Sequence, residues 1–379
     1  MQFRDLKTQY RVLKEDMDAA ISSVLKDCNF ISGNQVGELE KELSDYVGTK
    51  YCITCGNGTD ALTMMMMAWD IKENDAVFVP DFTFFASAEV VAFAGATPVF
   101  YDVFEDTFNA DTKSLEKAIK AVQAEGKLKP RAIIAVDLFG QPANYIELEK
   151  IAKKYGLLIL EDGAQGFGGQ IEDRKACSFG DAATTSFFPA KPLGCYGDGG
   201  AIFTNDDKTA EYLRSIRVHG KGSDKYDNVR IGWNSRLDTI QASVLQVKLK
   251  AFKEYELSRV NQVAEKYTKL LKDLVAVPVI PEKFYSSWAQ YTIKLSSKEE
   301  RDFIKQFLAE ENVPSMIYYS KTMHCQQAFK NLKDYVECPK AETLCERVLS
   351  LPMHPYLQDE DIMKVVSRLE KGIRILNGR

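Results

Sequence analysis

The chain is poor in histidine, has no long hydrophobic run and carries no excess of positive charge. Its 379 residues include only three histidines, at positions 219, 324 and 354, and none has the spacing of a metal site. The longest apolar run, residues 62–69, is too short to span a membrane, and residues 1–7 lack the apolar core of a secretory signal. A net charge of −5 argues against non-specific binding of nucleic acid, which needs a basic surface. A small anionic ligand stays compatible, because it needs only a local basic pocket.

The eight cysteines predict free thiols rather than a disulfide framework. Cys52 and Cys55 form a Cys-x-x-Cys pair, but no second pair follows at the spacing of a zinc site. Residues 51–55 read as a buried strand, which disfavours the alternative of a thioredoxin-like redox pair. Without a secretory signal, we expect the thiols to stay reduced in the cytoplasm.

Short β-rich runs alternate with helical patterns between residues 51 and 205. This alternation predicts an α/β fold with a mostly parallel sheet and helices on both faces. Strands are expected at 51–54, 76–79, 97–101, 131–136, 157–160, 183–187 and 200–204, and helices at 112–123 and 145–155. The four methionines within 62–69 are expected in a core helix, with a partner-binding face as the alternative. Ligands of such sheets bind at the carboxyl ends of the strands, where the polar motifs of this chain fall.

The pattern changes near residue 238. A long helix is expected over residues 238–274, where leucine, valine, lysine and glutamate recur at helical spacing. Beyond it we expect a strand at 289–295 and helices at 298–311 and 339–349. The sequence therefore predicts a large domain over residues 1–250 and a smaller α+β domain over residues 251–379.

Lys191 stands between an apolar run and a glycine-rich run. Phe187, Phe188 and Pro189 precede it, and four glycines follow within residues 194–200. Apolar burial lowers the pKa of a lysine, so that its amine can attack an aldehyde. Glycines let the backbone approach a flat ligand closely. The pattern predicts a lysine that forms a Schiff base with pyridoxal 5′-phosphate.

Two further motifs could complete such a site. Residues 56–62 follow a buried strand and open a helix, where amides and a hydroxyl suit a phosphate ester. The alternative is a plain helix cap by Thr59 or Asp60. Asp162 follows the apolar strand 157–160, and a buried acid needs a partner. A protonated pyridine nitrogen would be that partner, whereas the alternative is a cap for a following helix.

Aromatic residues and two histidines give weaker signals. Phe84 could stack on a cofactor ring, with core packing as the alternative, which applies more strongly to Phe85. His324 follows a polar aromatic loop, residues 318–321, that could cover a substrate. His354 is expected to make a structural hydrogen bond between domains.

The segment 232–238 precedes the long helix and holds Asn234 and Arg236 in a tight turn. Arg236 can bind phosphate or carboxylate through two parallel hydrogen bonds. The alternative is a helix start capped by Ser235, with Asp238 three residues later. Both interpretations can hold together.

Five motifs spread along the chain belong together. They are residues 58–62, Glu161-Asp162 with Gln165, 186–200 around Lys191, 234–238 and 351–355. In this order the chain resembles, nearly end to end, the DegT/DnrJ/EryC1/StrS family of nucleotide-sugar aminotransferases. The resemblance implies a fold-type I aminotransferase and a homodimer with active sites at the subunit interface. Gly163 and Gly166-Phe167 depart from the family's usual residues, which bears on the pocket shape and on substrate choice.

The resemblance implies roles for residues around the cofactor ring. Lys191 would form the internal aldimine with pyridoxal phosphate and then carry protons, while Asp162 would hold the pyridinium nitrogen. Gln165 and Phe84 would flank the ring. Some relatives have histidine in place of the lysine and are dehydratases, a branch against which Lys191 argues.

It also implies residues for the phosphate and for the substrate. Gly58, Thr59 and Ser186 would hold the phosphate, and Asn234 would reach it from the neighbouring subunit. Near the sugar or the diphosphate would lie Arg236, Tyr318 and Tyr319.

We therefore expect a two-stage transamination. L-Glutamate gives its amino group to the cofactor and leaves as 2-oxoglutarate, and a keto group of a nucleotide-linked sugar then takes the amine. Analogy with relatives that act on 3-keto-uronates favours a 3-keto sugar on a uridine diphosphate carrier, in surface polysaccharide or lipopolysaccharide biosynthesis. A 4-keto sugar or a dTDP-linked 3-keto sugar is the alternative.

Two alternatives come from other classes of protein. A non-catalytic regulator that binds pyridoxal phosphate would keep Lys191 but lose substrate residues such as Arg236, and this chain keeps both. A lyase or cysteine desulfurase would need a reactive cysteine on a mobile loop, whereas Cys195 sits in the glycine-rich turn.

Overall fold

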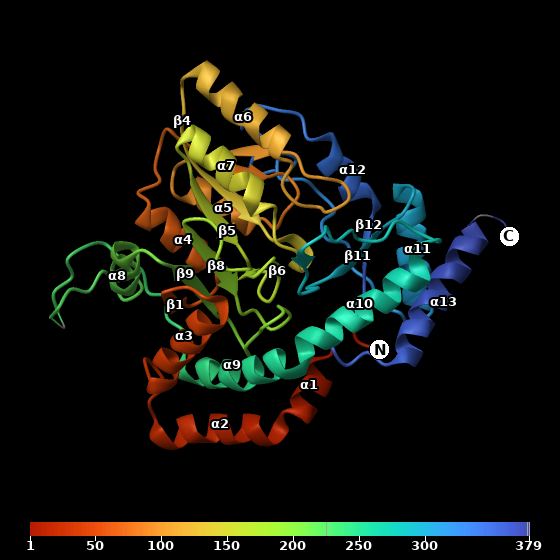
Figure 1. Cartoon of the computed structure of the whole chain (residues 1–379), viewed down its shortest axis with the longest axis horizontal. Helices are drawn as coiled ribbons and strands as arrows, with labels where there is room; N and C mark the ends of the chain where they lie inside the picture. The colour runs from red at the N-terminus through yellow and green to blue at the C-terminus, as the bar shows by residue number, and fades with distance from the viewer. Residues whose placement is uncertain (225, 377, 379) are drawn as a thin grey trace.

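A seven-stranded sheet organises the larger part of the protein (Figure 1). The computed structural model describes residues 1–224, 226–376 and 378. In spatial order the strands are β1 (Tyr51–Cys55), β9 (Gly200–Thr204), β8 (Ala182–Ser186), β5 (Leu158–Asp162), β4 (Lys129–Val136), β2 (Asp75–Pro80) and β3 (Thr97–Tyr101). Strand β9 is antiparallel to both neighbours, and the other pairs are parallel. The predicted α/β fold is confirmed, and each predicted strand is present.

Alternate residues of a strand pack against helices on opposite faces of this sheet. On β2, Val77 and Val79 join one hydrophobic cluster, whereas Ala76 and Phe78 join another. The first face is covered by α4 (Gly58–Ala68), α5 (Ala86–Phe93) and α8 (Asp207–Ile216), and the second by α3 (Asn34–Val47), α6 (Thr112–Glu125), α7 (Tyr145–Tyr155) and α9 (Thr239–Ala251). A strand buried on both faces reads as a continuous apolar run, which is why these strands are recognisable in the sequence.

The helix expected over residues 238–274 is one continuous rod. Helix α9 passes into a π-helical turn at Phe252–Glu256 and then into α10 (Leu257–Leu271). Figure 1 shows the rod running below the sheet and on to the C-terminal part. Helix α2 (Lys14–Asp27), which follows α1 (Leu6–Val12), packs beside α9. Among the described residues, neither this rod nor any other helix is long and apolar enough to cross a membrane.

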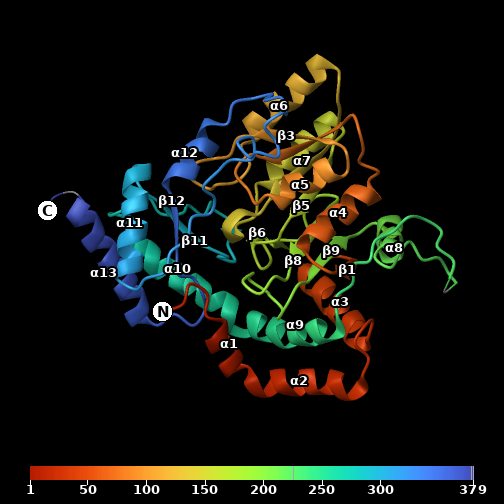
Figure 2. The same cartoon turned by 180° about the vertical axis from the view of Figure 1, so that it is seen from behind.

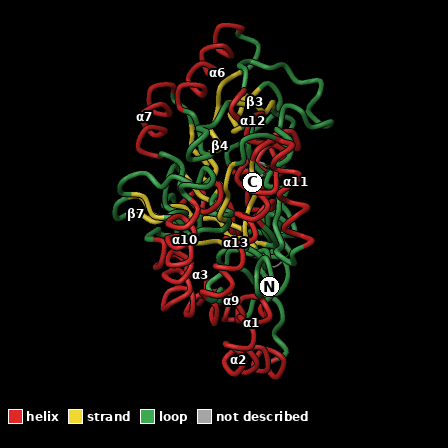
Figure 3. The backbone as a smooth tube through the Cα atoms, turned by 90° about the vertical axis from the view of Figure 1, so that its right-hand side faces the viewer, coloured by secondary structure: helices red, strands yellow, loops and turns green. Residues whose placement is uncertain are grey.

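The C-terminal part forms its own hydrophobic cluster within residues 257–373. Strands β11 (Tyr291–Lys294) and β12 (Val348–Leu351) pair there, beside α10, α11 (Lys298–Glu310) and α13 (Asp359–Leu376) (Figure 2). Helices α11 and α13 lie near the C-terminus of the chain (Figure 3). The helix predicted at 339–349 is too long by two residues: α12 (Pro339–Arg347) ends where Val348 begins to pair with β11. A small third sheet joins β6 (Gln170–Ile171), β7 (Arg174–Lys175) and β10 (Phe284–Tyr285).

The methionine run lies in the core, as the core-helix prediction requires. Met64, Met65 and Met66 of α4 are fully buried against the sheet. Met67, Ala68 and Trp69 are partly buried against the same cluster, so the run packs mainly into the core.

Replacing Met65 by alanine should lower the free energy of unfolding by about 2–5 kcal/mol, because truncation leaves a cavity under the sheet. Urea unfolding followed by circular dichroism measures this loss. The matched control is Met363→Ala on α13, whose side chain is 52% exposed and whose truncation should change stability by about 0.5 kcal/mol or less. Equal losses in the two variants would contradict the assignment of the run to the core.

Candidate active site

A cavity of about 660 Å³ opens where β4, β5 and β8 end. Nine of the residues predicted for the site line it, namely Gly58, Thr59, Phe84, Asp162, Gln165, Ser186, Lys191, Tyr318 and Tyr319. Carboxyl ends of parallel strands meet at one edge, so residues far apart in the sequence come together there. The position of the cavity agrees with the expectation from the strand pattern.

Lys191 is half-buried at this cavity. Burial lowers the pKa of its amine, the nearby Arg4 guanidinium lowers it further, and the carboxylate of Asp162 opposes both effects. The apolar run before it is only partly buried: Phe187 packs in the core, whereas Phe188 lines the cavity and is 53% exposed. Phe188 therefore belongs to the wall of the cavity and not to the core.

Asp162 is the last residue of β5 and is buried. Its Oδ2 accepts a hydrogen bond from the Ser87 hydroxyl (2.7 Å), and its Oδ1 accepts one from the Ala164 amide (3.2 Å). Burial raises the pKa of Asp162, while these two donors and the Lys191 amine lower it. Residues 164–168 form turns rather than a helix, so Asp162 does not cap a helix.

Ser87 and its neighbour Thr83 are site residues that the sequence motifs do not indicate. The hydroxyls of Thr83 and Ser87 lie 3.1 Å apart, and both residues are buried. The available signal was a pair of hydroxyl residues four positions apart, where a buried strand gives way to a helix. The Thr83 hydroxyl fixes the rotamer from which Ser87 donates to Asp162.

The loop before α4 forms a close cradle with the end of β8. A Cβ atom built on Gly58 would lie 2.7 Å from the Cβ of Ser186, so only glycine fits there. The helix is capped by Asn57, whose side chain accepts the Asp60 amide (2.7 Å), and the predicted caps Thr59 and Asp60 are wrong. The cap leaves the Gly58 and Thr59 amides at a helix N-terminus beside the Ser186 hydroxyl, which is a suitable place for an anion.

Asp60 instead anchors the segment 232–238. Its carboxylate accepts hydrogen bonds from the Ser235 hydroxyl (2.6 Å) and from the Trp233 indole (3.2 Å), and Ser235 accepts the Gly56 amide (2.8 Å). Ser235 is therefore buried and fixes the segment 232–238 to Gly56 and Asp60. Its predicted role as a helix cap is wrong, because α9 begins after Asp238.

Asn234 and Arg236 lie outside the Lys191 cavity of their own chain. Asn234 is exposed. Arg236 lines a separate cavity of about 470 Å³, together with Glu40 and the first residues of α3. One described chain thus brings nine of the eleven predicted residues together and leaves these two apart.

Gln165 and the aromatic residues form the opposite wall of the Lys191 cavity. The buried Gln165 accepts the Phe139 amide (2.7 Å) and donates to the Tyr319 hydroxyl (3.0 Å), so its side chain is held at both ends. Phe84 is 54% exposed, with its ring centroid 6.2 Å from that of Tyr319. Phe85 stacks on Phe329 at 5.2 Å, in agreement with the preference for core packing at this position.

A buried ion pair fixes the loop that carries Tyr318 and Tyr319. Asp81, which directly follows β2, accepts hydrogen bonds from the backbone amide (2.8 Å) and the ring Nδ1 (2.6 Å) of His324. The Asp81 carboxylate raises the pKa of His324 to about 9. His324 follows the loop that is expected to cover a substrate, whereas its partner Asp81 is distant in sequence and gives no local signal.

His354 does not make the structural hydrogen bond expected of it. The residue is buried, yet neither ring nitrogen has a hydrogen-bond partner among the described residues. Burial lowers the pKa of His354 to about 4, so the ring is neutral at physiological pH.

Known proteins match nearly the whole chain. The model of the DegT/DnrJ/EryC1/StrS aminotransferase family matches residues 11–370. The UDP-2-acetamido-2-deoxy-3-oxo-D-glucuronate aminotransferase of Pseudomonas aeruginosa is 41% identical over 370 residues, which are 97% of this chain and 99% of that protein. The pleiotropic regulatory protein of Geobacillus stearothermophilus is 39% identical over 376 residues, 98% of each chain. A solved DegT DnrJ EryC1 StrS aminotransferase from Brucella abortus has a TM-score of 0.96 and 48% identity, with full coverage of both chains.

The ion pair between His324 and Asp81 predicts a loss of stability in alkali. The folded-state pKa of His324 is raised above its unfolded value, so its contribution is complete below about pH 6.5 and disappears as the pH rises through about 9. His324→Gln should therefore cost about 1–3 kcal/mol at pH 6 and much less at pH 10. Urea unfolding of wild type and variant across this range measures the difference, with His219→Asn at an exposed position as the control. A loss that is equal at both pH values would contradict the ion pair.

Proposed function

The chain belongs to the DegT/DnrJ/EryC1/StrS aminotransferase family, and we propose that it transfers the amino group of L-glutamate to the C3 keto group of a UDP-linked sugar. The observation that carries the chemistry is the shared cavity of Lys191, Asp162 and the α4 N-terminus. The 3-oxo sugar in the name of the Pseudomonas aeruginosa relative supports the position of the keto group and the nucleotide.

The cofactor of the family is pyridoxal 5′-phosphate, and the residues of the cavity fit it. Bound there, it supplies an aldehyde that exchanges amino groups and a ring that withdraws electrons. We assign the phosphate to Gly58, Thr59 and Ser186, because a helix N-terminus with a hydroxyl beside it suits an anion. We assign the pyridine nitrogen to Asp162, which is a buried carboxylate with capacity for one more donor. Gln165 and Phe84 would lie beside the ring.

Lys191 would hold the cofactor and move the proton. Its lowered pKa favours the neutral amine, whose Nζ can accept the proton from the α-carbon of glutamate. Ser87 and the Ala164 amide stabilise the ionised form of Asp162, which keeps a negative charge opposite the pyridine nitrogen. Tyr318 and Tyr319 line the same cavity and are our candidates for contact with the sugar.

We propose a homodimer in which each subunit completes the site of the other. Phe84 and Phe188 border the cavity but are more than half exposed, which suits an incomplete site. Ile231, next to the segment 232–238, is 87% exposed. We assign Asn234 to the phosphate and Arg236 to the diphosphate in the site of the partner subunit, because neither residue lines the Lys191 cavity of its own chain.

Compartment, pathway and domain division are part of the same proposal. Eight free cysteines suit the reducing cytoplasm, where we place the enzyme, and the amino sugar would serve surface polysaccharide or lipopolysaccharide biosynthesis.

We divide the chain into domains 1–250 and 251–379, supported by the separate hydrophobic cluster within residues 257–373.

A regulatory protein is the second candidate, because the Geobacillus stearothermophilus relative carries that name. The two candidates differ in turnover. In an enzyme, glutamate must transfer its amino group to the bound cofactor, whereas a binding protein holds the cofactor unchanged.

The purified protein should be yellow, and Lys191→Ala should lose the visible absorption band, because the band requires the covalent bond between Lys191 and the cofactor. L-Glutamate should bleach the band of the wild type by converting the cofactor to its amine form. Absorption spectra with and without glutamate measure both effects. A band that survives in Lys191→Ala would exclude the role of the lysine, and a band that glutamate, glutamine and aspartate all leave unchanged would favour the regulator.

The amine form should react with a 3-keto UDP-sugar at a kcat/KM at least about tenfold above that for 4-keto UDP-sugars or dTDP-linked 3-keto sugars, since correct placement of the carbonyl against Lys191 is required. Return of the yellow band in stopped-flow mixing reports each rate. A faster reaction with a 4-keto sugar would contradict the proposed keto position and favour a 4-keto sugar aminotransferase.

Mixing two inactive variants should restore activity if Asn234 acts across the dimer. Lys191→Ala and Asn234→Asp each damage every site of their own homodimer, but a hybrid dimer holds one intact site. We expect recovery to about a quarter of wild-type activity after subunit exchange in an equal mixture, because hybrids form half of the dimers. The double variant Lys191→Ala/Asn234→Asp mixed with Lys191→Ala is the control and should stay inactive. No recovery, despite exchange seen by native mass spectrometry, would place Asn234 in its own subunit's site.

A further inference from the structure

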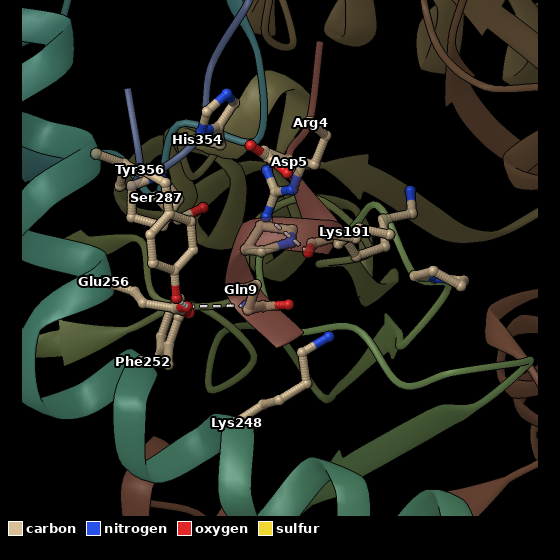
Figure 4. A pocket seen from close by; sticks show the side chains of 15 residues that line it. Arg4, Asp5, Gln9, Lys191, Lys248, Phe252, Glu256, Ser287, His354 and Tyr356 are labelled. Atoms are coloured by element: carbon tan, nitrogen blue, oxygen red, sulfur yellow. Dashed lines mark hydrogen bonds between the residues drawn. The ribbon is translucent and has the colours of Figure 1, made fainter. Parts of the chain in front are cut away.

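A second cavity touches Lys191 and is lined by charged groups (Figure 4). Its volume is about 20 Å³, enough for about one water molecule. The charged lining comes from two regions: Arg4 and Asp5 near the N-terminus, and Lys248 and Glu256 on the long rod, while the C-terminal part adds the neutral ring of His354. Apart from the effect of Arg4 on the pKa of Lys191, none of these groups has a role in the chemistry described above.

Two cations of this cluster bind the main chain of the Lys191 turn. Arg4 donates from Nη2 to the carbonyl oxygen of Lys191 (2.8 Å), and Lys248 donates from Nζ to the carbonyl oxygen of Gly194. Lys248 is only 2% exposed. Hydrogen bonds from charged donors are stronger than those between neutral groups, so the turn is held at both of its ends.

Glu256 supplies the balancing negative charge. It is buried in the π-helical turn and accepts hydrogen bonds from the Gln9 amide (2.9 Å) and the Tyr356 hydroxyl (2.5 Å). Its carboxylate raises the pKa of both Arg4 and Lys248, against the effect of burial, which lowers these pKa values to about 10 and about 8. Cations in a buried site need such a partner, and Glu256 therefore keeps Arg4 charged.

The position of Arg4 is set by its neighbours in the chain. The carbonyl of Phe3 accepts the amide of Met353 (3.2 Å), and the side chain of Asp5 caps α1 through the Thr8 amide (2.9 Å). Arg4 is thus held between two anchored residues and has little freedom to leave the Lys191 turn.

We propose that Arg4 is a positioning residue for Lys191: it holds the main chain of the lysine and keeps a fixed positive charge near its amine. The proposal rests on the proposed function of Lys191. The charged groups that share a cavity with the lysine come from several elements. Asp60 of α4, Asp162 of β5 and Asp198 line the larger cavity, and Arg4, Asp5, Lys248 and Glu256 line the smaller one. His354 is neutral and adds no charge. A positive charge near the Lys191 nitrogen disfavours its protonation, so Arg4 favours the form that accepts a proton.

The test compares Arg4→Met, which removes the charge, with Arg4→Lys, which keeps it but loses the planar guanidinium. Both are measured as holoenzyme by the pH titration of the visible band and by the rate of bleaching with glutamate. In Arg4→Met the titration midpoint should move to higher pH, and bleaching should slow about tenfold for the loss of a charged hydrogen bond. Arg4→Lys should keep the wild-type midpoint and bleach at an intermediate rate.

Lys294→Met is the matched control. Lys294 is also a partly buried cation, and it donates to the main-chain carbonyl of Glu105 (2.7 Å), away from both cavities. This variant should lower the thermal midpoint of unfolding but leave the titration and the bleaching rate unchanged. It separates positioning from a general loss of stability.

The proposal is overturned if Arg4→Met keeps the wild-type titration midpoint and the wild-type rate of bleaching, whatever the thermal stability of the variant. If Arg4→Met does not fold, Arg4→Lys carries the test, and a wild-type bleaching rate in that variant overturns the proposal. Failure of the proposed function gives a different result. Either the wild-type protein would have no visible band, or the Lys191→Ala variant would keep the band.

Discussion

A carboxylate buried opposite a half-buried amine is the constraint around which this structure is arranged. Asp162 and Lys191 sit at the edge of a sheet whose faces are both covered, so neither charge has much water to stabilise it. Each therefore has its own set of polar supports. Ser87 and an amide serve Asp162, while Arg4 contacts the main chain of Lys191. The strand order makes this possible, because β5 and β8 are neighbours and end at the same edge.

Much of the fold and part of the candidate site could be predicted because the signals are local. Strands such as β2 and β5 are apolar on both faces, and their sequences show it without reference to other segments. The residues at the strand ends then follow from the rule that parallel strands gather their carboxyl ends. That rule is sufficient to bring Gly58, Asp162 and Ser186 together.

The parts that could not be predicted depend on contacts between distant segments. Ser235 has every local property of a helix cap, yet Asp60, 175 positions away, takes its hydroxyl. The local sequence shows Asp81 only as an acid at the end of a strand, because its partner His324 lies 243 positions further along the chain. Phe188 follows a buried phenylalanine but lines the cavity, because β8 ends at Ser186 and the chain then turns along the edge of the sheet. Such outcomes are set by packing rather than by propensity.

The unbroken rod from Thr239 to Leu271 has a mechanical consequence. The backbone passes from the sheet to the C-terminal part through a helix and not through a flexible linker, so the two parts cannot swing freely on a loop. Any relative displacement has to flex the rod, and its weakest section is the π-helical turn at Phe252–Glu256, where the regular hydrogen-bond ladder is interrupted. Bending there displaces Glu256, and with it the counter-charge of the cluster behind Lys191. The position of the counter-charge behind the lysine therefore depends on the shape of the helix at this turn.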